Sequence, residues 1–205
     1  MTEIENIIFD FGGVLYDIDV QLSIDAFKKI GIVNKPWQDG QDKIFDLIEK
    51  GLMNNKEIIE YFRSDNNLTD SEILKAFNAI LIGVNKKSYK NLLKLKKNYS
   101  LFLLSNTNEI HFDKFSKEII EDKNTKEFYN CFTKEYYSYK LKMRKPDKEI
   151  FQYLINDSKI EAKKSLFIDD TFSNLENAKK LGLKTFWMNN NNSWNSLIEE
   201  FGLKI

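Results

Sequence analysis

The stretch "IIFDFGGVLYDID", Ile7 to Asp19, decides the fold. It opens with apolar, largely β-branched residues that are typical of a buried strand. Asp10 follows at the point where the chain breaks into Gly12-Gly13. Ligands of α/β proteins bind at the carboxyl ends of parallel strands. The stretch therefore predicts a strand that carries a carboxylate to a ligand-binding edge.

Four short apolar runs predict strands of the same kind: Asn6–Phe9, Ser100–Leu104, Ser165–Ile168 and Thr185–Met188. Each run is continuous rather than alternating, as expected for parallel strands that are covered on both faces. Segments with helical spacing lie between and after them, one following Asp147 and another ending at Gly182. The polar run Asn189–Asn192 predicts a loop before a last helix. We predict an α/β fold with a Rossmann-like parallel sheet and helices on both faces.

The region from about Val20 to Leu95 interrupts this alternation with four segments of helical spacing and no strand between them. Thr69 and Glu72 form a capping box at the start of the last segment. We expect residues 19–95 to form a small all-helical cap, inserted after the first strand. The alternative is that these helices belong to the main core.

The predicted domains are therefore a core made of residues 1–18 and 96–205 and a cap made of residues 19–95. Trp37, Phe45 and Tyr61 of the cap are candidate substrate contacts. Aromatic residues at helical spacing more often pack in a core, so that alternative stays open.

Composition excludes several partners. The formal net charge is zero, which gives no electrostatic reason to expect nucleic acid or an anionic membrane surface. No apolar stretch approaches the roughly 20 residues that cross a bilayer, and the N-terminus does not resemble a signal peptide. The single cysteine, Cys131, fits a reducing compartment. We expect a soluble, cytoplasmic protein, either a monomer or a homodimer.

Polar residues follow three of the predicted strands. Asp10 follows the first, Ser105-Asn106 the second and Asp169-Asp170 the third, while Lys145 precedes a helix between the last two. Adjacent carboxylates repel each other unless a cation joins them. Carboxylate oxygens suit Mg²⁺, and the sequence has no histidine–cysteine cluster for zinc. The sequence therefore predicts a Mg²⁺ site that includes Asp10.

A phosphate held at such a site can be attacked by Asp10, which gives an aspartyl-phosphate that water then hydrolyses. Ser105 and the amide of Asn106 can hydrogen-bond a phosphoryl oxygen. Lys145 can neutralise charge on the phosphoryl group and on Asp10. Taken alone, each of these residues also has an ordinary structural interpretation, such as a turn or a surface lysine.

The combination resembles the haloacid dehalogenase (HAD) superfamily of hydrolases. The resemblance rests on four motifs in the family's order: "IIFDFGGVLYD", "FLLSNTN", "RKPD" and "LFIDD" with Asn174. "LSNTNEIH" and "MRKPDKEIF" are similar to the bacterial subgroup that includes α-D-glucose-1-phosphate phosphatase. The helical insertion matches the family's C1-type cap. The resemblance implies a Mg²⁺-dependent phosphomonoesterase that acts on a small phosphorylated metabolite, first of all a sugar phosphate.

The resemblance also implies a role for each motif residue. Asp10 is the nucleophile and a metal ligand, Asp170 and the Gly12 carbonyl are further ligands, and Asp169 supports the metal. The resemblance implies that the phosphate is bound by Ser105, Asn106 and Gly13. It also implies that Lys145 holds the nucleophile Asp10 and the phosphate together. Pro146 after Lys145 is a candidate for a cis peptide bond.

Gly12 departs from the family pattern, because most phosphatases of this superfamily carry a second aspartate two residues after the nucleophile. That aspartate protonates the leaving group, and such help is worth roughly 10²–10⁴-fold. Another group or a water can take this role, and an anomeric phosphate leaves easily enough to need it less. Asp17, Asp19 and His111 are candidates, although capping or packing is the simpler explanation of each of them.

Two other functions fit Gly12. A 2-haloacid dehalogenase needs no proton for the departing halide. Such enzymes use no Mg²⁺, usually lack the acidic pair at Asp169-Asp170, and offer an arginine to the halide or carboxylate. This chain has few arginines, Arg63 and Arg144 among them. The other function is that of a non-catalytic module that binds phosphate or a partner protein.

Overall fold

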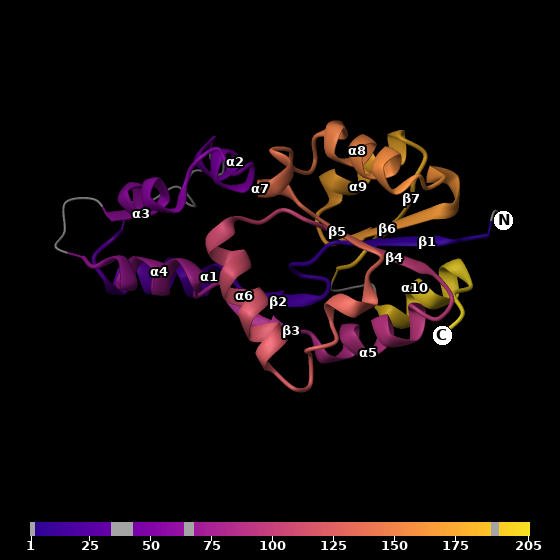
Figure 1. Ribbon diagram of the computed structural model, residues 1–205, viewed down its shortest axis with the longest axis horizontal. Coiled ribbons are helices and arrows are strands. Elements are labelled where there is room, and N and C mark those ends of the chain that lie inside the picture. The colour runs from indigo at the N-terminus through magenta and orange to yellow at the C-terminus, as the bar shows by residue number, and fades with distance from the viewer. Residues whose placement is uncertain (1–2, 34–42, 64–67, 190–192) are drawn as a thin grey trace.

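A five-stranded parallel sheet lies at the centre of the chain, with the strand order β5-β4-β1-β6-β7 (Figure 1). The computed structural model describes residues 3–33, 43–63, 68–189 and 193–205. The strands are β1 (Asn6–Phe9), β4 (Ser100–Ser105), β5 (Lys134–Tyr137), β6 (Ser165–Asp169) and β7 (Lys184–Trp187). Phe9 of β1 pairs with Leu103 of β4 and Ile168 of β6, so these three strands end at one edge.

The four predicted strands are present with bounds that differ by at most one residue at either end. The strand β5 was not predicted. It lies at the edge of the sheet and begins with two charged residues, Lys134 and Glu135, so it lacks the continuous apolar run of a central strand.

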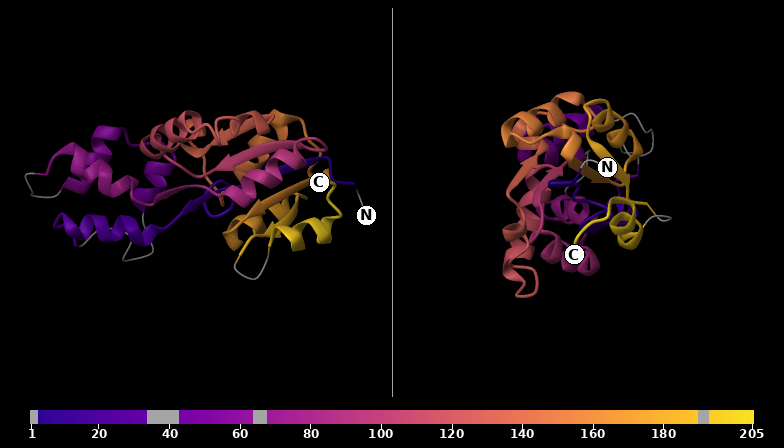
Figure 2. Two further views of the ribbon diagram at one scale, coloured as in Figure 1. Left: turned by 90° about the horizontal axis from the view of Figure 1, so that it is seen from below. Right: turned by 90° about the vertical axis from the view of Figure 1, so that its right-hand side faces the viewer.

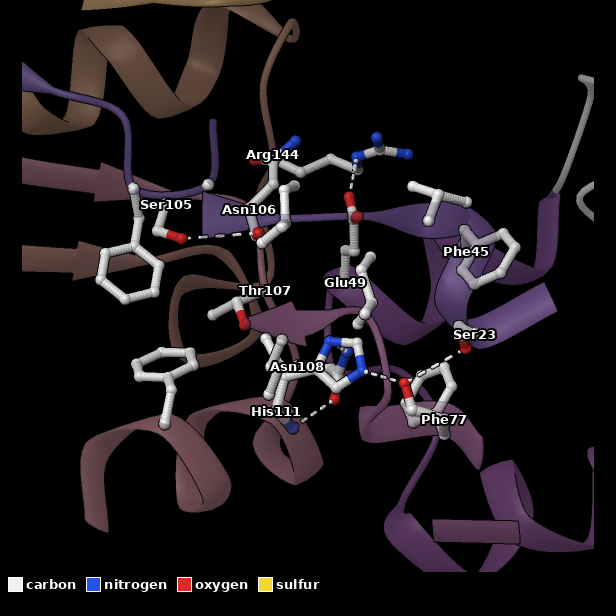
Figure 3. Close-up of a pocket in the computed structure, with 17 residues that line it drawn as sticks. Ser23, Phe45, Glu49, Phe77, Ser105, Asn106, Thr107, Asn108, His111 and Arg144 are labelled. Carbon is white, nitrogen blue, oxygen red and sulfur yellow. Dashed lines mark hydrogen bonds and ion pairs between the residues drawn. The ribbon is translucent and has the colours of Figure 1, made fainter. Parts of the chain in front are cut away.

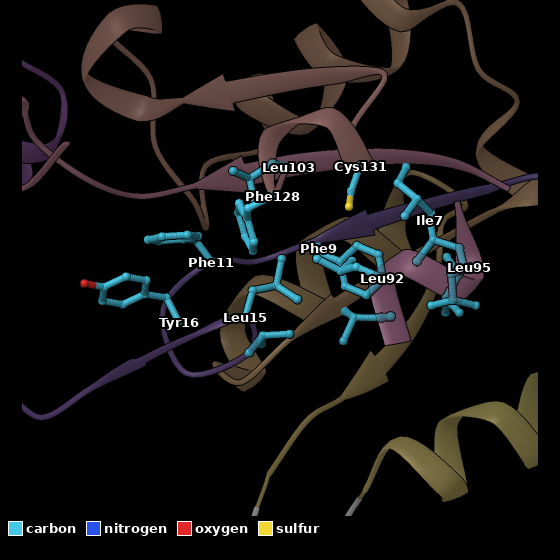
Figure 4. Close-up of a cluster of buried hydrophobic side chains, with 14 of the residues drawn as sticks. Ile7, Phe9, Phe11, Leu15, Tyr16, Leu92, Leu95, Leu103, Phe128 and Cys131 are labelled. Atoms are coloured by element: carbon cyan, nitrogen blue, oxygen red, sulfur yellow. The ribbon is translucent and has the colours of Figure 1, made fainter. Parts of the chain in front are cut away.

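Helices cover both faces of the sheet, as predicted. One face packs on α8 (Lys148–Ser158) and α9 (Phe172–Lys180). The other packs on α5 (Lys86–Leu95), α6 (Glu109–Glu121) and α10 (Trp194–Phe201). Successive side chains of β1 point to opposite faces of the sheet, so the strand contributes to two apolar clusters. Ile7 and Phe9 pack in the cluster on the side of α5, α6 and α10 (Figure 4), and Ile8 packs in the cluster on the side of α8 and α9. Cys131 is buried with a free thiol in the cluster on the side of α5, α6 and α10, which fits a structural role.

Four further helices project from the sheet's carboxyl edge as a separate lobe (Figure 2). They are α1 (Val20–Lys29), α2 (Lys43–Glu49), α3 (Asn55–Arg63) and α4 (Asp70–Asn78). The lobe has an apolar cluster of its own, and Ile110 of α6 joins it from the core. The predicted capping box of Thr69 and Glu72 is present at the start of α4.

An antiparallel ribbon connects the lobe to the sheet, formed by β2 (Tyr16–Ile18) and β3 (Leu81–Val84). This ribbon was not predicted, because two strands of three and four residues give too short a pattern in the sequence. The remaining short elements are η2 (Tyr129–Cys131), α7 (Ser138–Leu141) and η3 (Ala162–Lys164). Over the described ranges, every helix is too short or too polar to traverse a lipid bilayer. The predicted loop at Asn189–Asn192 falls mostly outside the described residues.

Candidate active site

Three carboxylates meet at the carboxyl edge of the sheet. Asp10 follows β1, Asp169 is the last residue of the neighbouring β6, and Asp170 comes next. The Asp10 main-chain N–H donates to the Ile168 carbonyl at 2.8 Å, which extends the pairing of the two strands. One carboxylate oxygen from each of the three residues lies within 4.8 Å of the others. The structure thus brings together the two ends of the chain that the sequence analysis placed at one metal site.

Lys145 bridges two of these carboxylates. Its Nζ lies 2.7 Å from Asp10 Oδ1 and 2.7 Å from Asp169 Oδ2, and the lysine side chain is 1% exposed. Burial opposes the charged ammonium, but Asp10 and Asp169 outweigh it and raise the pKa of Lys145. The lysine is therefore charged, and it occupies one oxygen of each partner.

The cluster needs more positive charge than one lysine. Burial and then the neighbouring Asp169 raise the pKa of the Asp10 carboxyl well above its usual value, although Lys145 lowers it. The same two causes raise the pKa of Asp170. Three carboxyl groups share one ammonium here, and their mutual repulsion disfavours the charged forms unless further positive charge is supplied. A hard divalent cation with oxygen ligands fits this group of side chains.

The carboxylates of the cluster differ in the hydrogen-bond donors that surround them. Asp169 is surrounded by donors, because Asn174 Nδ2 lies 3.0 Å from both of its oxygens and the Thr171 N–H donates to Oδ1 at 2.8 Å. Asp170 accepts from the Thr171 hydroxyl at a longer distance, 3.2 Å. Asp170 and Asp10 are therefore better placed to bind a cation directly, and Asp169 to fix Lys145.

Gly13 has a steric reason to be glycine. Its φ is +75°, and a Cβ on it would overlap Asp170 Oδ2. The residue was predicted to bind substrate, and that role stays a prediction. What the structure adds is that Gly13 makes room for a carboxylate of the acidic cluster.

Ser105 is the last residue of β4, next to β1, and Asn106 follows it. The Asn106 side chain accepts from the Lys145 N–H at 2.9 Å and donates to the Lys145 carbonyl at 2.8 Å. It therefore holds the segment that carries the lysine, whose peptide bond to Pro146 is cis. The main-chain N–H of Asn106 is the group that can make the predicted phosphate contact.

A cavity of about 530 Å³ lies beside this edge, beneath the helical lobe (Figure 3). Gly12, Ser105 and Asn106 line it from the core, and Phe45 and Phe77 from the lobe. Most of its wall is apolar. Such a volume is typical of sites for small ligands.

Two charged residues line this cavity, of which Glu49 was not predicted and Arg144 was named only for a dehalogenase. Glu49, at the end of α2, and Arg144, just before Lys145, both line it, and Glu49 Oε2 lies 2.9 Å from Arg144 Nε (Figure 3). The two atoms are close but not aligned as a hydrogen bond. Glu49 lies among the many Lys and Glu residues of the cap helices, so nothing in the sequence distinguishes it. The motif "RKPD" did contain Arg144, which was considered only in relation to a dehalogenase.

The three aromatic residues that were predicted as candidate substrate contacts have different outcomes. Phe45 lines the cavity. Tyr61 packs in the apolar cluster of the lobe, edge-on to Phe62 with ring centroids 5.1 Å apart. Trp37 lies outside the described residues.

Asp17 and Asp19 have structural partners. Asp17 accepts a hydrogen bond from Asn85 Nδ2 at 2.9 Å, and Asp19 caps α1 by accepting from the Gln21 N–H at 2.8 Å. Neither lines the cavity. These contacts favour the capping interpretation over a catalytic one.

His111 connects the core to the lobe. Its Nε2 lies 3.2 Å from the Phe77 carbonyl and its Nδ1 lies 3.1 Å from Asn108 Nδ2. A carbonyl only accepts and an amide NH₂ only donates, so Nε2 carries the proton and Nδ1 accepts. The imidazole also stacks on the Phe77 ring at 4.3 Å between centroids. Because both ring nitrogens are occupied, the histidine is placed to pack rather than to transfer protons.

We expect acid to weaken the protein through His111. Burial lowers its pKa from 6.5 to about 4. Between these values the unfolded chain binds a proton that the native state does not, so the free energy of unfolding falls as the pH falls, by up to about 3 kcal/mol. His111→Gln keeps an amide donor and acceptor but does not titrate. Urea denaturation at about pH 7 and pH 4.5 should show a smaller loss in this variant, and equal losses would exclude His111 as the cause.

The fold and the site define an α/β enzyme with an acidic, cation-binding centre under a helical lobe. The family model of haloacid dehalogenase-like hydrolases matches residues 4–182. The chain therefore belongs to the haloacid dehalogenase-like hydrolases, as the motifs predicted.

Similar proteins are phosphatases and hydrolases of this family. The chain is 34% identical to a D-ribitol-5-phosphate phosphatase of Bacteroides thetaiotaomicron, over 93% of this chain and 95% of that protein. A crystal structure of a HAD family enzyme from the same organism, in complex with magnesium and inorganic phosphate, has a TM-score of 0.86 at 35% identity, over 95% of this chain and 98% of that one. The structure of a predicted HAD-like hydrolase from Porphyromonas gingivalis has a TM-score of 0.84 at 29% identity, over 96% and 97% of the two chains.

Proposed function

We propose that the protein is a Mg²⁺-dependent phosphomonoesterase that hydrolyses a small sugar or polyol phosphate through an aspartyl-phosphate on Asp10. The observation that carries the proposal is the meeting of Asp10, Lys145 and Asp170 beside a cavity of about 530 Å³. The similar phosphatase, whose substrate is named as ribitol 5-phosphate, and the similar enzyme bound to magnesium and phosphate support it. The predicted cytoplasmic location stays a prediction.

Each site residue has a task in this reaction. Asp10 attacks phosphorus, and Lys145 holds the attacking carboxylate and offsets phosphoryl charge. Ser105 and the main-chain N–H of Asn106 donate to the phosphoryl oxygens, whereas the Gly13 N–H already donates to the Tyr16 carbonyl at 3.0 Å. Mg²⁺, when bound by Asp10, Asp170 and the Gly12 carbonyl, supplies positive charge to the phosphoryl group.

The helical lobe is the cap in this proposal, and it excludes water from the cavity. Its predicted span was residues 19–95. The lobe's own apolar cluster supports a cap that ends near Ile80, because Phe77 belongs to it, whereas Leu92 and Leu95 of α5 belong to the core cluster.

A dehalogenase remains the alternative with an observation behind it, because Arg144 lines the cavity. Glu49 lies beside that arginine, however, and would repel the carboxylate of a haloacid. The acidic cluster also needs a cation that halide displacement does not use.

Turnover of phosphate esters tests the proposal. We expect a panel of pentitol and hexose phosphates to be hydrolysed with Mg²⁺ and turnover to stop when a chelator removes the metal, because the uncompensated carboxylates repel the phosphate dianion. Inorganic phosphate release is the measurement. Metal-independent chloride release from 2-chloropropionate would establish the dehalogenase instead. Phosphate binding without any turnover would establish a binding module.

A further inference from the structure

The proposed reaction needs a proton donor, and the position that holds one in most phosphatases of this family is Gly12. A Cβ on Gly12 would lie 3.0 Å from Ile18 Cδ1, so an apolar side chain fills the adjoining space. Asp17 and Asp19 do not line the cavity. Within the described part of the chain, Glu49 is the one carboxylate in the cavity wall.

Glu49 reaches the cavity from the cap. It is the last residue of α2, and its side chain is 24% exposed. Arg144, which precedes Lys145 in the core, holds it at 2.9 Å. The carboxyl group is thereby fixed over the segment that carries Lys145, on the cap side of the cavity whose core side is lined by Gly12 and Ser105 (Figure 3).

The surroundings of Glu49 raise its pKa above that of an ordinary glutamate. Burial raises its pKa, Arg144 and then Lys145 of the core segment lower it, and Asp46 of its own helix raises it, with a net increase. A phosphate dianion in the cavity adds negative charge and raises the pKa further. A general acid works best when its pKa lies near the operating pH.

We propose that Glu49 is the general acid and base of this enzyme, supplied by the cap in place of the missing aspartate at position 12. This inference rests on the proposed phosphatase function. In the first step Asp10 bonds to phosphorus, the bond from phosphorus to the ester oxygen breaks, and Glu49 gives its proton to that oxygen. The alcohol leaves, with the aspartyl-phosphate and the Glu49 carboxylate remaining.

The second step restores both residues. Glu49 takes a proton from water as the water oxygen bonds to phosphorus. The bond from phosphorus to Asp10 breaks and its electron pair returns to the Asp10 carboxylate. Inorganic phosphate departs and Glu49 is protonated again. Arg144 acts as a positioning residue, because it orients the Glu49 carboxyl and sets its pKa.

Leaving groups of different quality test Glu49. n-Butyl phosphate has a poor leaving group, p-nitrophenyl phosphate a good one, and neither carries a hydroxyl that Glu49 could recognise. We expect Glu49→Gln to lower kcat/KM for the butyl ester by about 10²-fold or more and for the aryl ester by less than about tenfold. An equal loss on both esters would overturn the inference while leaving the phosphatase function intact. If the wild-type protein hydrolyses neither these two esters nor any of the pentitol and hexose phosphates, the proposed function itself fails.

Lys50→Gln is the matched control. Lys50 follows Glu49, pairs with Asp147 of the core at 3.2 Å and does not line the cavity. This variant removes a neighbouring contact between cap and core, so we expect the ratio of the two rates to stay at its wild-type value. A changed ratio would mean that cap position, rather than the Glu49 proton, sets the preference.

Two further variants give readouts that a structural role would not move. Gly12→Asp in the Glu49→Gln background should recover part of the butyl ester activity, since only the flexible end of Ile18 must shift. Arg144→Gln removes a charge that lowers the pKa of Glu49. The alkaline limb of kcat against pH for the butyl ester should therefore move upward, by about one pH unit. An unmoved limb together with no recovery would contradict the assignment.

Discussion

Asp10→Asn should lower kcat for every phosphate ester that the wild-type protein hydrolyses by about 10⁴-fold or more, as removal of a nucleophile does in other hydrolases. An amide of the same shape cannot attack phosphorus, and it also removes a proposed metal ligand. Mass spectrometry after an acid quench should find a phosphoryl group on the wild-type peptide that contains Asp10 and none on the variant. Turnover at the wild-type rate would end the aspartyl-phosphate mechanism.

Loss of the fold does not explain such a result. Burial and Asp169 raise the pKa of Asp10, which means that its charged form is costly in the metal-free protein. A neutral amide removes that cost, so we expect the melting temperature of the metal-free variant to equal or exceed that of the wild type. Asp17→Asn is the matched control, because Asp17 is exposed, bonds to Asn85 and lies away from the cavity. It should retain activity.

Buried strands made most of the fold predictable. Residues 6–9, 100–105 and 165–169 are covered on both faces, so their apolar runs identify them without reference to the rest of the chain. β5 was missed because it opens with Lys134 and Glu135, and the β2–β3 ribbon was missed because its strands have only three and four residues. The apolar positions of α5 were assigned to the cap, yet Leu92 and Leu95 face the sheet, a choice that only tertiary packing makes.

The residues of the site also differ in whether the sequence alone could predict them. Asp10 and Asp169-Asp170 were predictable, because they stand at strand ends that the parallel topology brings together. Lys145 lies in the loop before α8, and the motif "RKPD" rather than a strand end pointed to it. Glu49 and Arg144 were not predictable, because their meeting depends on how a cap helix lies against a core loop. The proximity of Gly13 to Asp170 was equally hidden, since it joins residues far apart in the chain.

Lys145→Met should damage both stability and turnover. The methionine keeps an apolar stem of similar length but leaves Asp10 and Asp169 without their shared cation in a buried site. Removing one partner of a buried ion pair costs about 3–5 kcal/mol, and we expect that loss in urea denaturation of the metal-free protein at neutral pH. Lys134→Met is the control, because its ion pair with Asp157 lies at the surface, and we expect no comparable loss of stability.

Magnesium separates the two roles of this lysine. Without the ammonium the acidic cluster is more negative, so Lys145→Met should bind Mg²⁺ about tenfold more tightly or better in calorimetry, and saturating Mg²⁺ should restore much of the lost stability. Turnover should stay at least 10²–10³-fold below wild type even then, since the metal cannot replace the charge that Lys145 places on Asp10 and the phosphoryl group. Full activity in the Mg²⁺-saturated variant would show that the lysine only balances charge. Weaker Mg²⁺ binding would show instead that it organises the carboxylates for the metal.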